Sequence, residues 1–283
     1  MLWARGLLLV PTLFSCWLSA LQADPGVLPT VVGTNVCADL VLLSVADPAQ
    51  ILSLSRQSLD SGWPWLEETA AAYPSNRGSV EELLHLKPDI ALVYLGWGGR
   101  RHAELLARQG IRVLPVPYPG DWADALETAR QIGAEIGRSV EAAAAADAAE
   151  ARMQALAETA HGQRVLYLRP NGGTAGDDTY VDDVLTRIGL RNLAAEQGIH
   201  GWGRVPLERL VGNPPDVFLL GYFDQPQALT SSAFGRHPLF RAMLERTPSI
   251  AVEAGAWGCG GLELVQAAEQ IAAALDRLDE PPP

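Results

Sequence analysis

The sequence predicts an α/β protein of two similar lobes, each a central parallel sheet flanked by helices, joined by a single long rigid helix. Three observations lead to this fold class. Short apolar runs alternate with amphipathic stretches, which is typical of parallel sheets covered by helices on both faces. One sequence motif occurs twice, at Glu81 and at Glu208, 127 residues apart. An alanine-rich stretch without Gly or Pro separates the two copies.

The first 23 residues, MLWARGLLLVPTLFSCWLSALQA, have the pattern of a secretory signal. A single charge, Arg5, precedes an apolar run that is too short for a transmembrane helix, and small residues follow it. Cleavage after Ala20 or Ala23 fits this pattern. A lipoprotein signal, in which Cys16 becomes the lipidated N-terminus, stays open as an alternative, although the bulky Phe14 disfavours it. The remaining chain is expected to be a soluble exported domain.

The N-terminal lobe is expected over residues 24–137. Its strands and helices alternate, as a parallel sheet requires. The expected strands are Thr30–Val32, Ile51–Ser55, Ile90–Tyr94 and Arg112–Val116. Helices are expected near Ala38–Val45, after the first strand, and at Ala103–Gln109, before the last. A further helix, capped by Asp121, ends the lobe, and its apolar face comprises Trp122, Leu126, Ala129, Ile132 and Ile136.

The connecting helix is expected over residues 138–161. Its stretch Ser139–Ala160 is dominated by alanine, and its only large apolar residues are Val140, Met153 and Leu156. High helix propensity without a wide apolar stripe favours an exposed, stiff strut. Twenty-two residues would span about 33 Å, enough to run along a small domain.

The C-terminal lobe is expected over residues 162–283. Its predicted elements are strands at Arg164–Leu168, Val217–Gly221 and Ile250–Val252 and helices at Val181–Ile188 and Leu262–Leu278. Each lobe contains one copy of the repeated motif, EELLHLKPDIALV in the first and ERLVGNPPDVFLL in the second. Both copies place a Glu seven residues before a Pro-Asp pair. Each copy predicts a short helix, a proline that ends it, and a strand buried on both faces.

Composition and motifs exclude several function classes. The chain has 21 basic and 33 acidic residues, a net charge of −12, and no basic run, which argues against nucleic acid and anionic membranes as partners. It has no GxSxG, HExxH or GxxxxGK[ST] motif, and its five histidines form no pair at metal-ligand spacing. We therefore expect neither an enzyme nor a bound cofactor or metal ion. An exported hydrolase using a loop acid with His200 or His237 is the rival class.

Two cysteines, Cys37 and Cys259, follow the signal. An oxidising compartment would allow them to form a disulfide, but 222 residues separate them, and sequence does not show that they meet. The alternative, two separate buried thiols, stays open.

Aromatic and arginine side chains in predicted loops are the candidate ligand-binding residues. Several follow a strand directly, and ligands bind outside the carboxyl ends of strands in open parallel sheets. Rigid aromatic rings provide stacking surfaces, and a guanidinium can bind a carboxylate, phosphate or catecholate. The candidates are Trp63, Trp65, Tyr94, Trp97, Trp202, Tyr222 and Trp257 with Arg77, Arg100, Arg101, Arg169 and Arg236. The glycine-rich run Asn171–Gly176 is a weaker candidate for binding an anion on its backbone N–H groups.

Several motifs resemble those of the periplasmic binding proteins that serve ABC importers of iron chelates and vitamin B12. These are NVCADL at Asn35–Leu40, NRGSVEELLHLKPD at Asn76–Asp89, NGGTAG at Asn171–Gly176 and WGCGG at Trp257–Gly261. The resemblance covers roughly residues 28–278. It implies a class III binding-protein fold and a periplasmic location.

The resemblance also implies partners. A monomer would bind a small-molecule metal chelate between its lobes and deliver it to a permease dimer in the membrane. A ferric siderophore ranks first as the ligand, a cobalamin or other corrinoid second, and haem third. In this family one acid on each lobe docks with permease arginines, and Glu81 and Glu208 occupy those positions. Their alternative role is to complement the dipole at a helix N-terminus.

Overall fold

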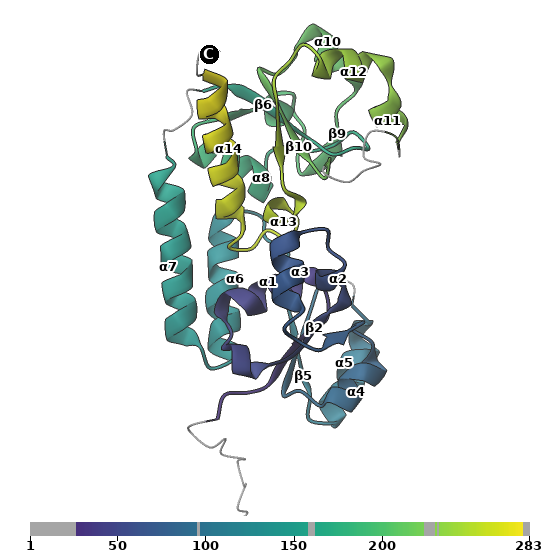
Figure 1. The fold of residues 1–283 in the computed structure, drawn as a ribbon, viewed down its shortest axis with the longest axis vertical. Helices are drawn as coiled ribbons and strands as arrows, with labels where there is room; N and C mark the ends of the chain where they lie inside the picture. Colours follow the sequence, from purple (N-terminus) through teal and green to yellow (C-terminus); the bar gives the residue numbers. More distant parts are fainter. Residues whose placement is uncertain (1–26, 95–96, 158–161, 224–229, 231, 280–283) are drawn as a thin grey trace, which may run out of the picture.

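The computed structural model describes residues 27–94, 97–157, 162–223, 230 and 232–279. Two lobes are stacked along the long axis of the molecule, and a pair of helices runs beside both of them (Figure 1). The predicted signal at residues 1–23, with Cys16, lies outside the described residues. Among the helices that are described, none combines the length and apolar character needed to cross a membrane.

The N-terminal lobe is built on a five-stranded parallel sheet in the order β3-β2-β1-β4-β5. Its strands are β1 (Val31–Gly33), β2 (Ile51–Ser55), β3 (Ser75–Asn76), β4 (Ile90–Val93) and β5 (Arg112–Pro115). Its helices are α1 (Val36–Val45), the 3-10 turn Pro48–Gln50, α2 (Arg56–Leu59), α3 (Pro64–Ala70), α4 (Val80–Leu86) and α5 (Gly99–Arg108). The strands expected at 30–32, 51–55, 90–94 and 112–116 are thus present with shifts of one residue at most.

The C-terminal lobe contains a four-stranded parallel sheet, β11-β10-β6-β8, and an antiparallel pair, β7-β9. The strands are β6 (Arg164–Leu168), β7 (Gly173–Ala175), β8 (Arg191–Asn192), β9 (Trp202–Arg204), β10 (Val217–Gly221) and β11 (Ser249–Val252). The helices are α8 (Tyr180–Arg187), α9 (Leu193–Glu196), α10 (Leu207–Gly212), α11 (Ala233–Arg236), α12 (Pro238–Leu244), α13 (Ala254–Trp257) and α14 (Leu264–Asp279). Part of the glycine-rich run Asn171–Gly176, the weaker candidate for binding an anion, forms β7.

Both central sheets are covered on two faces, which is why their strands are apolar without alternation. In β6, Val165 and Tyr167 pack into one core with α8 and α14, whereas Leu166 and Leu168 pack into another with α9 and α12. The parallel β4 and β10 occupy equivalent interior positions in their sheets.

The duplicated Pro-Asp pair has the same structural role in both lobes. Asp89 Oδ2 accepts hydrogen bonds from the backbone N–H and the hydroxyl of Thr30, at 2.8 Å each, just before β1. Asp216 Oδ2 accepts the backbone N–H of Arg164, at 2.7 Å, where β6 begins. Each aspartate therefore fixes the start of the strand that pairs with its own. The repeat predicted from sequence corresponds to a real structural duplication.

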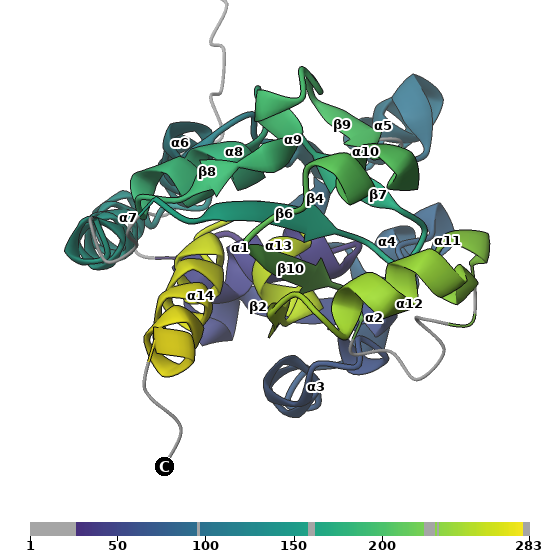
Figure 2. The same cartoon turned by 90° about the horizontal axis from the view of Figure 1, so that it is seen from above.

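The connection between the lobes is a pair of antiparallel helices, so the prediction of a single connecting helix is incomplete. Helix α6 (Trp122–Glu135) begins in the core of the C-terminal lobe, where Trp122 is fully buried, and its second half packs in the N-terminal core through Ala129 and Ile132. Helix α7 (Ser139–Ala155) returns beside it. Figure 2 shows α7 at the edge of the molecule, beside α14.

The expectation that the alanine-rich helix is an exposed strut is wrong for one of its faces. Ala142, Ala146, Ala149 and Met153 of α7 are buried. Small side chains let helix backbones approach closely: a Cβ on Gly133 of α6 would lie 2.1 Å from that of Ala142. The alanines therefore form a contact surface for α6. Helix α7 ends at Ala155, and residues 158–161 of the expected helix lie outside the described part of the chain.

Candidate ligand-binding site

Aromatic side chains from both lobes gather where the lobes meet. They follow strands or begin helices, as expected for a site at the carboxyl ends of parallel strands. Tyr94 follows β4, Tyr118 follows β5, Tyr167 lies on β6, Tyr180 begins α8, Trp202 begins β9, Tyr222 follows β10 and Trp257 ends α13. We call these seven residues the aromatic wall. Sequence reasoning included Tyr94, Trp202, Tyr222 and Trp257 and missed Tyr118, Tyr167 and Tyr180.

Ring contacts connect most of the aromatic wall. The ring centroids of Tyr94 and Tyr118 are 6.3 Å apart, and those of Tyr118 and Tyr180 are 5.7 Å apart. Trp202 lies 5.6 Å from Tyr180, 6.5 Å from Tyr118 and 6.3 Å from Tyr167. The planes are tilted or perpendicular, which is the favourable arrangement of aromatic quadrupoles.

The wall has a buried layer and an accessible layer. Tyr167, Tyr180 and Trp257 are fully buried, whereas Tyr118 and Trp202 each expose 38% of their surface. The Tyr180 hydroxyl donates a 2.8 Å hydrogen bond to the carbonyl oxygen of Trp257, which joins α8 to α13. The buried residues thus support two rings that face solvent and are available to contact a ligand.

Arg169 places a cation among these rings. Its guanidinium carbon lies 4.4 Å from the centroid of Trp202, 5.0 Å from Tyr222 and 5.9 Å from Tyr167. Its Nε donates a 3.1 Å hydrogen bond to the Tyr167 hydroxyl. Cation–π contacts of this kind contribute about 0.5–2 kcal/mol each and fix the orientation of the group. The sequence predicted Arg169 as a binding residue, and the structure places it, half-buried, between the exposed Trp202 and the buried Tyr167.

Burial sets the protonation states at the wall. It raises the pKa of Tyr167 to about 12 and also raises the pKa values of Tyr94, Tyr118 and Tyr180. Burial lowers the pKa of Arg169, but Tyr167, Tyr222 and Tyr180 together raise it, so that pKa stays above its usual value. At neutral pH the site therefore presents neutral phenols around a permanent cation.

Trp63 lies beside the wall and contacts the other lobe. A Cβ on Gly255 of α13 would lie 2.8 Å from the Trp63 indole, and one on Gly258 would lie 3.1 Å from the Tyr222 hydroxyl. Both glycines therefore allow rings to pack directly on the backbone. The structure thus brings together six of the candidates from sequence: Trp63, Tyr94, Arg169, Trp202, Tyr222 and Trp257.

The other six candidates lie elsewhere. Trp65 is 38% exposed and lines a pocket of about 270 Å³ between α1, α7 and α14. Trp97 donates a 2.7 Å hydrogen bond from Nε1 to the carbonyl of Gly78 and packs against the core of the N-terminal lobe. Arg77, Arg100, Arg101 and Arg236 are exposed. Arg100 and Arg101 lie in α5 and Arg236 in α11, so the expectation that these three lie in loops is wrong.

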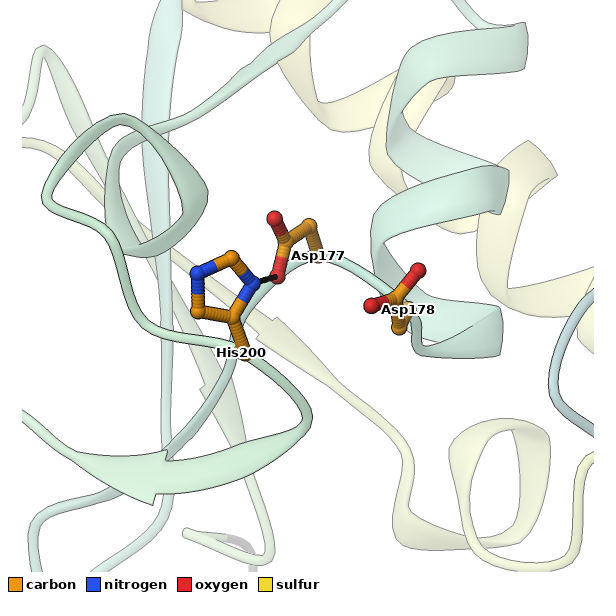
Figure 3. A group of neighbouring side chains, drawn as sticks. All are labelled: Asp177, Asp178 and His200. Atoms are coloured by element: carbon orange, nitrogen blue, oxygen red, sulfur yellow. Dashed lines mark ion pairs between the residues drawn. The ribbon is translucent and has the colours of Figure 1, made fainter.

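One group of side chains among the described residues has the composition of a metal site: Asp177, Asp178 and His200 (Figure 3). His200 Nδ1 lies 2.7 Å from Asp177 Oδ1, and a backbone bridge joins the same two residues. Asp178 and His200 are exposed, whereas Asp177 is partly buried. The pair joins the end of β7 to the loop that carries Trp202. Its structural role is to position that loop, and His237 likewise caps α12.

Glu263 is a buried acid at the junction of the lobes. It is 8% exposed, and its Oε1 accepts a 2.8 Å hydrogen bond from the backbone N–H of Gly261. Burial raises the pKa of this carboxyl to about 7. Burial likewise raises the pKa of Asp39 to about 7, although Ser58 and Ser55 donate hydrogen bonds to that carboxylate.

These raised pKa values predict stability that falls as pH rises. Below about pH 4 the Glu263 carboxyl is protonated in both the folded and the unfolded protein. Between its unfolded pKa near 4.3 and its folded pKa of about 7, only the folded protein keeps the proton, so the free energy of unfolding falls as pH rises through that window. Glu263→Gln stays neutral. The free energy of unfolding of this variant, relative to that of the wild type, should rise by about 3 kcal/mol between pH 4 and pH 8. Urea unfolding at both pH values measures it. The exposed Glu68→Gln should show no such gain. An equal wild-type–variant difference at both pH values would contradict the assignment.

The two predicted docking acids occupy equivalent positions. Glu81 and Glu208 are each the second residue of a helix, α4 and α10, and both are exposed. The two helices lie on different lobes, on the side of the molecule away from α7 (Figures 1 and 2). In α4 the capping box is made by Ser79 and Glu82, which leaves Glu81 outside it.

Comparison with known proteins identifies the family. A family model described as periplasmic binding protein matches residues 31–243. A search of curated protein sequences finds no significant match. Among solved structures, the fold is similar to the heme-binding protein RhuT of Roseiflexus sp. RS-1, at 18% identity, a TM-score of 0.69, and coverage of 90% of this chain and 100% of that one.

Two structures from Vibrio cholerae are similar as well. The heme-binding protein HutB is 20% identical, with a TM-score of 0.70 and coverage of 87% of this chain and 98% of that one. The vitamin B12-binding protein BtuF is 15% identical, with a TM-score of 0.63 and coverage of 90% and 99%. The rival expectation of an exported hydrolase is thereby set aside. The chain belongs to the family of periplasmic binding proteins, the solute-binding components of ABC importers, and is not an enzyme.

Proposed function

We propose that this protein binds a ferric siderophore at the aromatic wall and delivers it to the permease dimer of an ABC importer. The observation that carries this proposal is Arg169, whose guanidinium lies 4.4 Å and 5.0 Å from the Trp202 and Tyr222 ring centroids. A cation among aromatic faces complements a chelate whose own ligand groups are anionic and aromatic, such as a ferric catecholate.

Two further features support an anionic ligand. The chain carries a net charge of −12, so a local cation at the wall is the place where an anion is attracted rather than repelled. The Tyr94 hydroxyl is buried and has no hydrogen-bond partner within the described residues. Buried polar groups without partners are uncommon, and here the phenol offers a donor to a ligand.

A corrinoid is the second candidate ligand. The exposed indole of Trp202 offers a flat apolar surface of the kind that suits a large macrocycle, and BtuF of Vibrio cholerae, a vitamin B12-binding protein, has a similar fold. Haem is the third candidate, since RhuT and HutB are heme-binding proteins with similar folds.

Isothermal titration with three purified ligands tests the proposal. We expect a ferric tris-catecholate siderophore to bind more tightly than cyanocobalamin or haemin, and to quench tryptophan fluorescence through Trp202 and Trp257. If cyanocobalamin or haemin bound most tightly, that compound would be the ligand and the siderophore proposal would be wrong. Absence of heat and of quenching with all three ligands would overturn the proposed ligand class.

We propose further that Glu81 and Glu208 dock the protein on the permease, one acid on each lobe. Complementary charges across such an interface raise association rates and fix orientation. Glu81→Arg with Glu208→Arg should abolish uptake in cells while leaving ligand affinity within about twofold, because neither residue contacts the wall. The matched control is Glu68→Arg, which reverses an exposed acid on α3. Equal loss of uptake in the control, or a loss of ligand affinity in the double variant, would contradict docking.

The family places the protein in the periplasm, and we propose that residues 1–23 direct its export and are then removed. Intact mass of the exported protein distinguishes cleavage near Ala23 from lipidation of Cys16.

A further inference from the structure

Cys37 and Cys259 form a disulfide between the two lobes, with their Cα atoms 5.2 Å apart. Cys37 lies in α1, which packs on β1 and β2 of the N-terminal sheet. Cys259 follows α13 in the segment that leads from β11 to α14 of the C-terminal lobe. In Figure 1, α13 lies directly between β10 and helices α1 and α3. The bond is therefore a covalent connection between lobes that is separate from the α6–α7 pair.

The disulfide lies in a small core shared by the lobes. Cys259 is 7% exposed and packs with Leu40 and Leu66 of the N-terminal lobe. Trp63 packs against the same cluster and against Gly255 of α13. The bond thus lies inside apolar packing that the N-terminal lobe provides around Cys259, and the chain on either side of Cys259 belongs to the C-terminal lobe.

The C-terminal end of this connection is continuous with the ligand site. Trp257 stands two residues before Cys259; its carbonyl accepts the Tyr180 hydroxyl at 2.8 Å, and its ring centroid lies 5.5 Å from that of Tyr167. Gly260, on the other side of Cys259, leaves no space for a Cβ, which would lie 2.5 Å from Pro119 and 3.1 Å from Tyr180. The segment that carries Cys259 therefore packs against both Pro119, next to Tyr118, and Tyr180, and the rings of Tyr118 and Tyr180 meet across the junction.

We propose that the Cys37–Cys259 disulfide holds the two lobes at the spacing at which Tyr94 and Tyr118 meet Tyr180 and Trp202, so that the aromatic wall is assembled before ligand arrives. Helices α6 and α7 pack side by side and act as one strap, about which the lobes could rock. A second attachment through α1 and α13 restrains that motion. The proposal deepens the proposed binding role, and its primary test needs no ligand.

Single-molecule energy transfer between dyes on the two lobes tests the spacing. Ketone-bearing amino acids at the exposed positions Glu68, on α3, and Glu245, after α12, accept dyes without using thiols. Three samples are compared: the oxidised protein, the same protein reduced by dithiothreitol, and the Cys37→Ala/Cys259→Ala variant. Reduction converts the S–S bond into two thiols and dithiothreitol into its cyclic disulfide. Using the reduced sample guards against a variant that fails to fold.

We expect one narrow distance distribution for the oxidised protein and a broadened distribution with a second population in the other two samples. If the disulfide were purely stabilising, breaking it would lower the midpoint of unfolding without altering the inter-dye distance in the folded state. Leu66→Ala supplies the matched control, because it weakens the same shared core but leaves the bond intact; its distribution should stay narrow. Identical distributions in oxidised and reduced folded protein would overturn the proposal.

A second measurement links the spacing to binding. If only a fraction of the reduced molecules has an assembled wall, the apparent Kd for the ferric tris-catecholate siderophore rises by the inverse of that fraction. The energy-transfer histogram gives the same fraction independently. Agreement of the two numbers supports a preassembled site. A broadened histogram with an unchanged Kd would show that the bond restrains the lobes without assembling the wall. Absence of binding to any ligand would contradict the proposed function and would leave the energy-transfer result as it stands.

Discussion

Replacing both Cys37 and Cys259 with alanine should lower the free energy of unfolding by about 5 kcal/mol at 25 °C, the largest effect we expect from any change in this protein. The bond closes a loop of 222 residues, which restricts nearly the whole described chain in the unfolded state. Chain-entropy stabilisation grows with the logarithm of loop length, so this disulfide lies near the upper end of the usual range. Urea unfolding followed by tryptophan fluorescence measures the loss.

The double substitution also removes two sulfur atoms from a packed core, and reduction of the wild type separates the two contributions. Reduction cuts the loop and keeps the atoms, so most of the loss should appear on reduction alone. Any further loss of unfolding free energy in the double alanine variant measures the cost of the cavity left by the two sulfur atoms. A loss on reduction below about 1 kcal/mol would show that the unfolded chain gains little freedom from cleavage, contrary to the entropic account.

Arg169→Ala should raise the Kd for the anionic chelate by about 10- to 100-fold, which corresponds to the 1.5–3 kcal/mol of a hydrogen bond to a charged group. The substitution removes the cation and leaves the Trp202 and Tyr222 rings without the group that they orient. Titration calorimetry measures the change, and thermal unfolding confirms that the variant is folded.

Two variants sharpen this prediction. Arg169→Lys keeps the charge but loses the planar group that stacks on both rings, so it should restore only part of the affinity. Arg101→Ala removes an exposed arginine of α5 and should change Kd by less than about twofold. If Arg101→Ala weakened binding and Arg169→Ala did not, the ligand would contact the N-terminal lobe near α5 instead of the wall.

Strands β4 and β10 were predictable because each is a continuous apolar run that begins directly after a Pro-Asp pair. The pairing of α6 with α7 was not, since a stripe of alanines has little hydrophobic contrast, and close approach of two backbones leaves no clear periodic signal. Gly133 opposite Ala142 was the available sign of such an approach. Small residues at helix spacing indicate a contact surface only once the partner helix is known.

The candidate site was predictable where an aromatic side chain stands beside glycine, as Trp202 does at the start of β9. Tyr167 was missed because it lies inside the apolar run of β6, where a buried aromatic residue is indistinguishable from ordinary core. Tyr118 and Tyr180 come from segments 62 residues apart, and their meeting depends on how the lobes stack. Arg100 and Arg101 looked like loop residues because two glycines precede them, but those glycines begin α5.

The separation of Cys37 from Cys259 has a consequence for how the protein is made. Chains emerge from the ribosome N-terminus first, so the Cys37 thiol has no intended partner until both sheets have been synthesised. The N-terminal lobe, whose strands β1 to β5 are contiguous in sequence, can fold during that interval and bury α1. Closure of the bond then follows the arrival of α13, and an oxidised molecule is one in which both lobes have already been produced and joined.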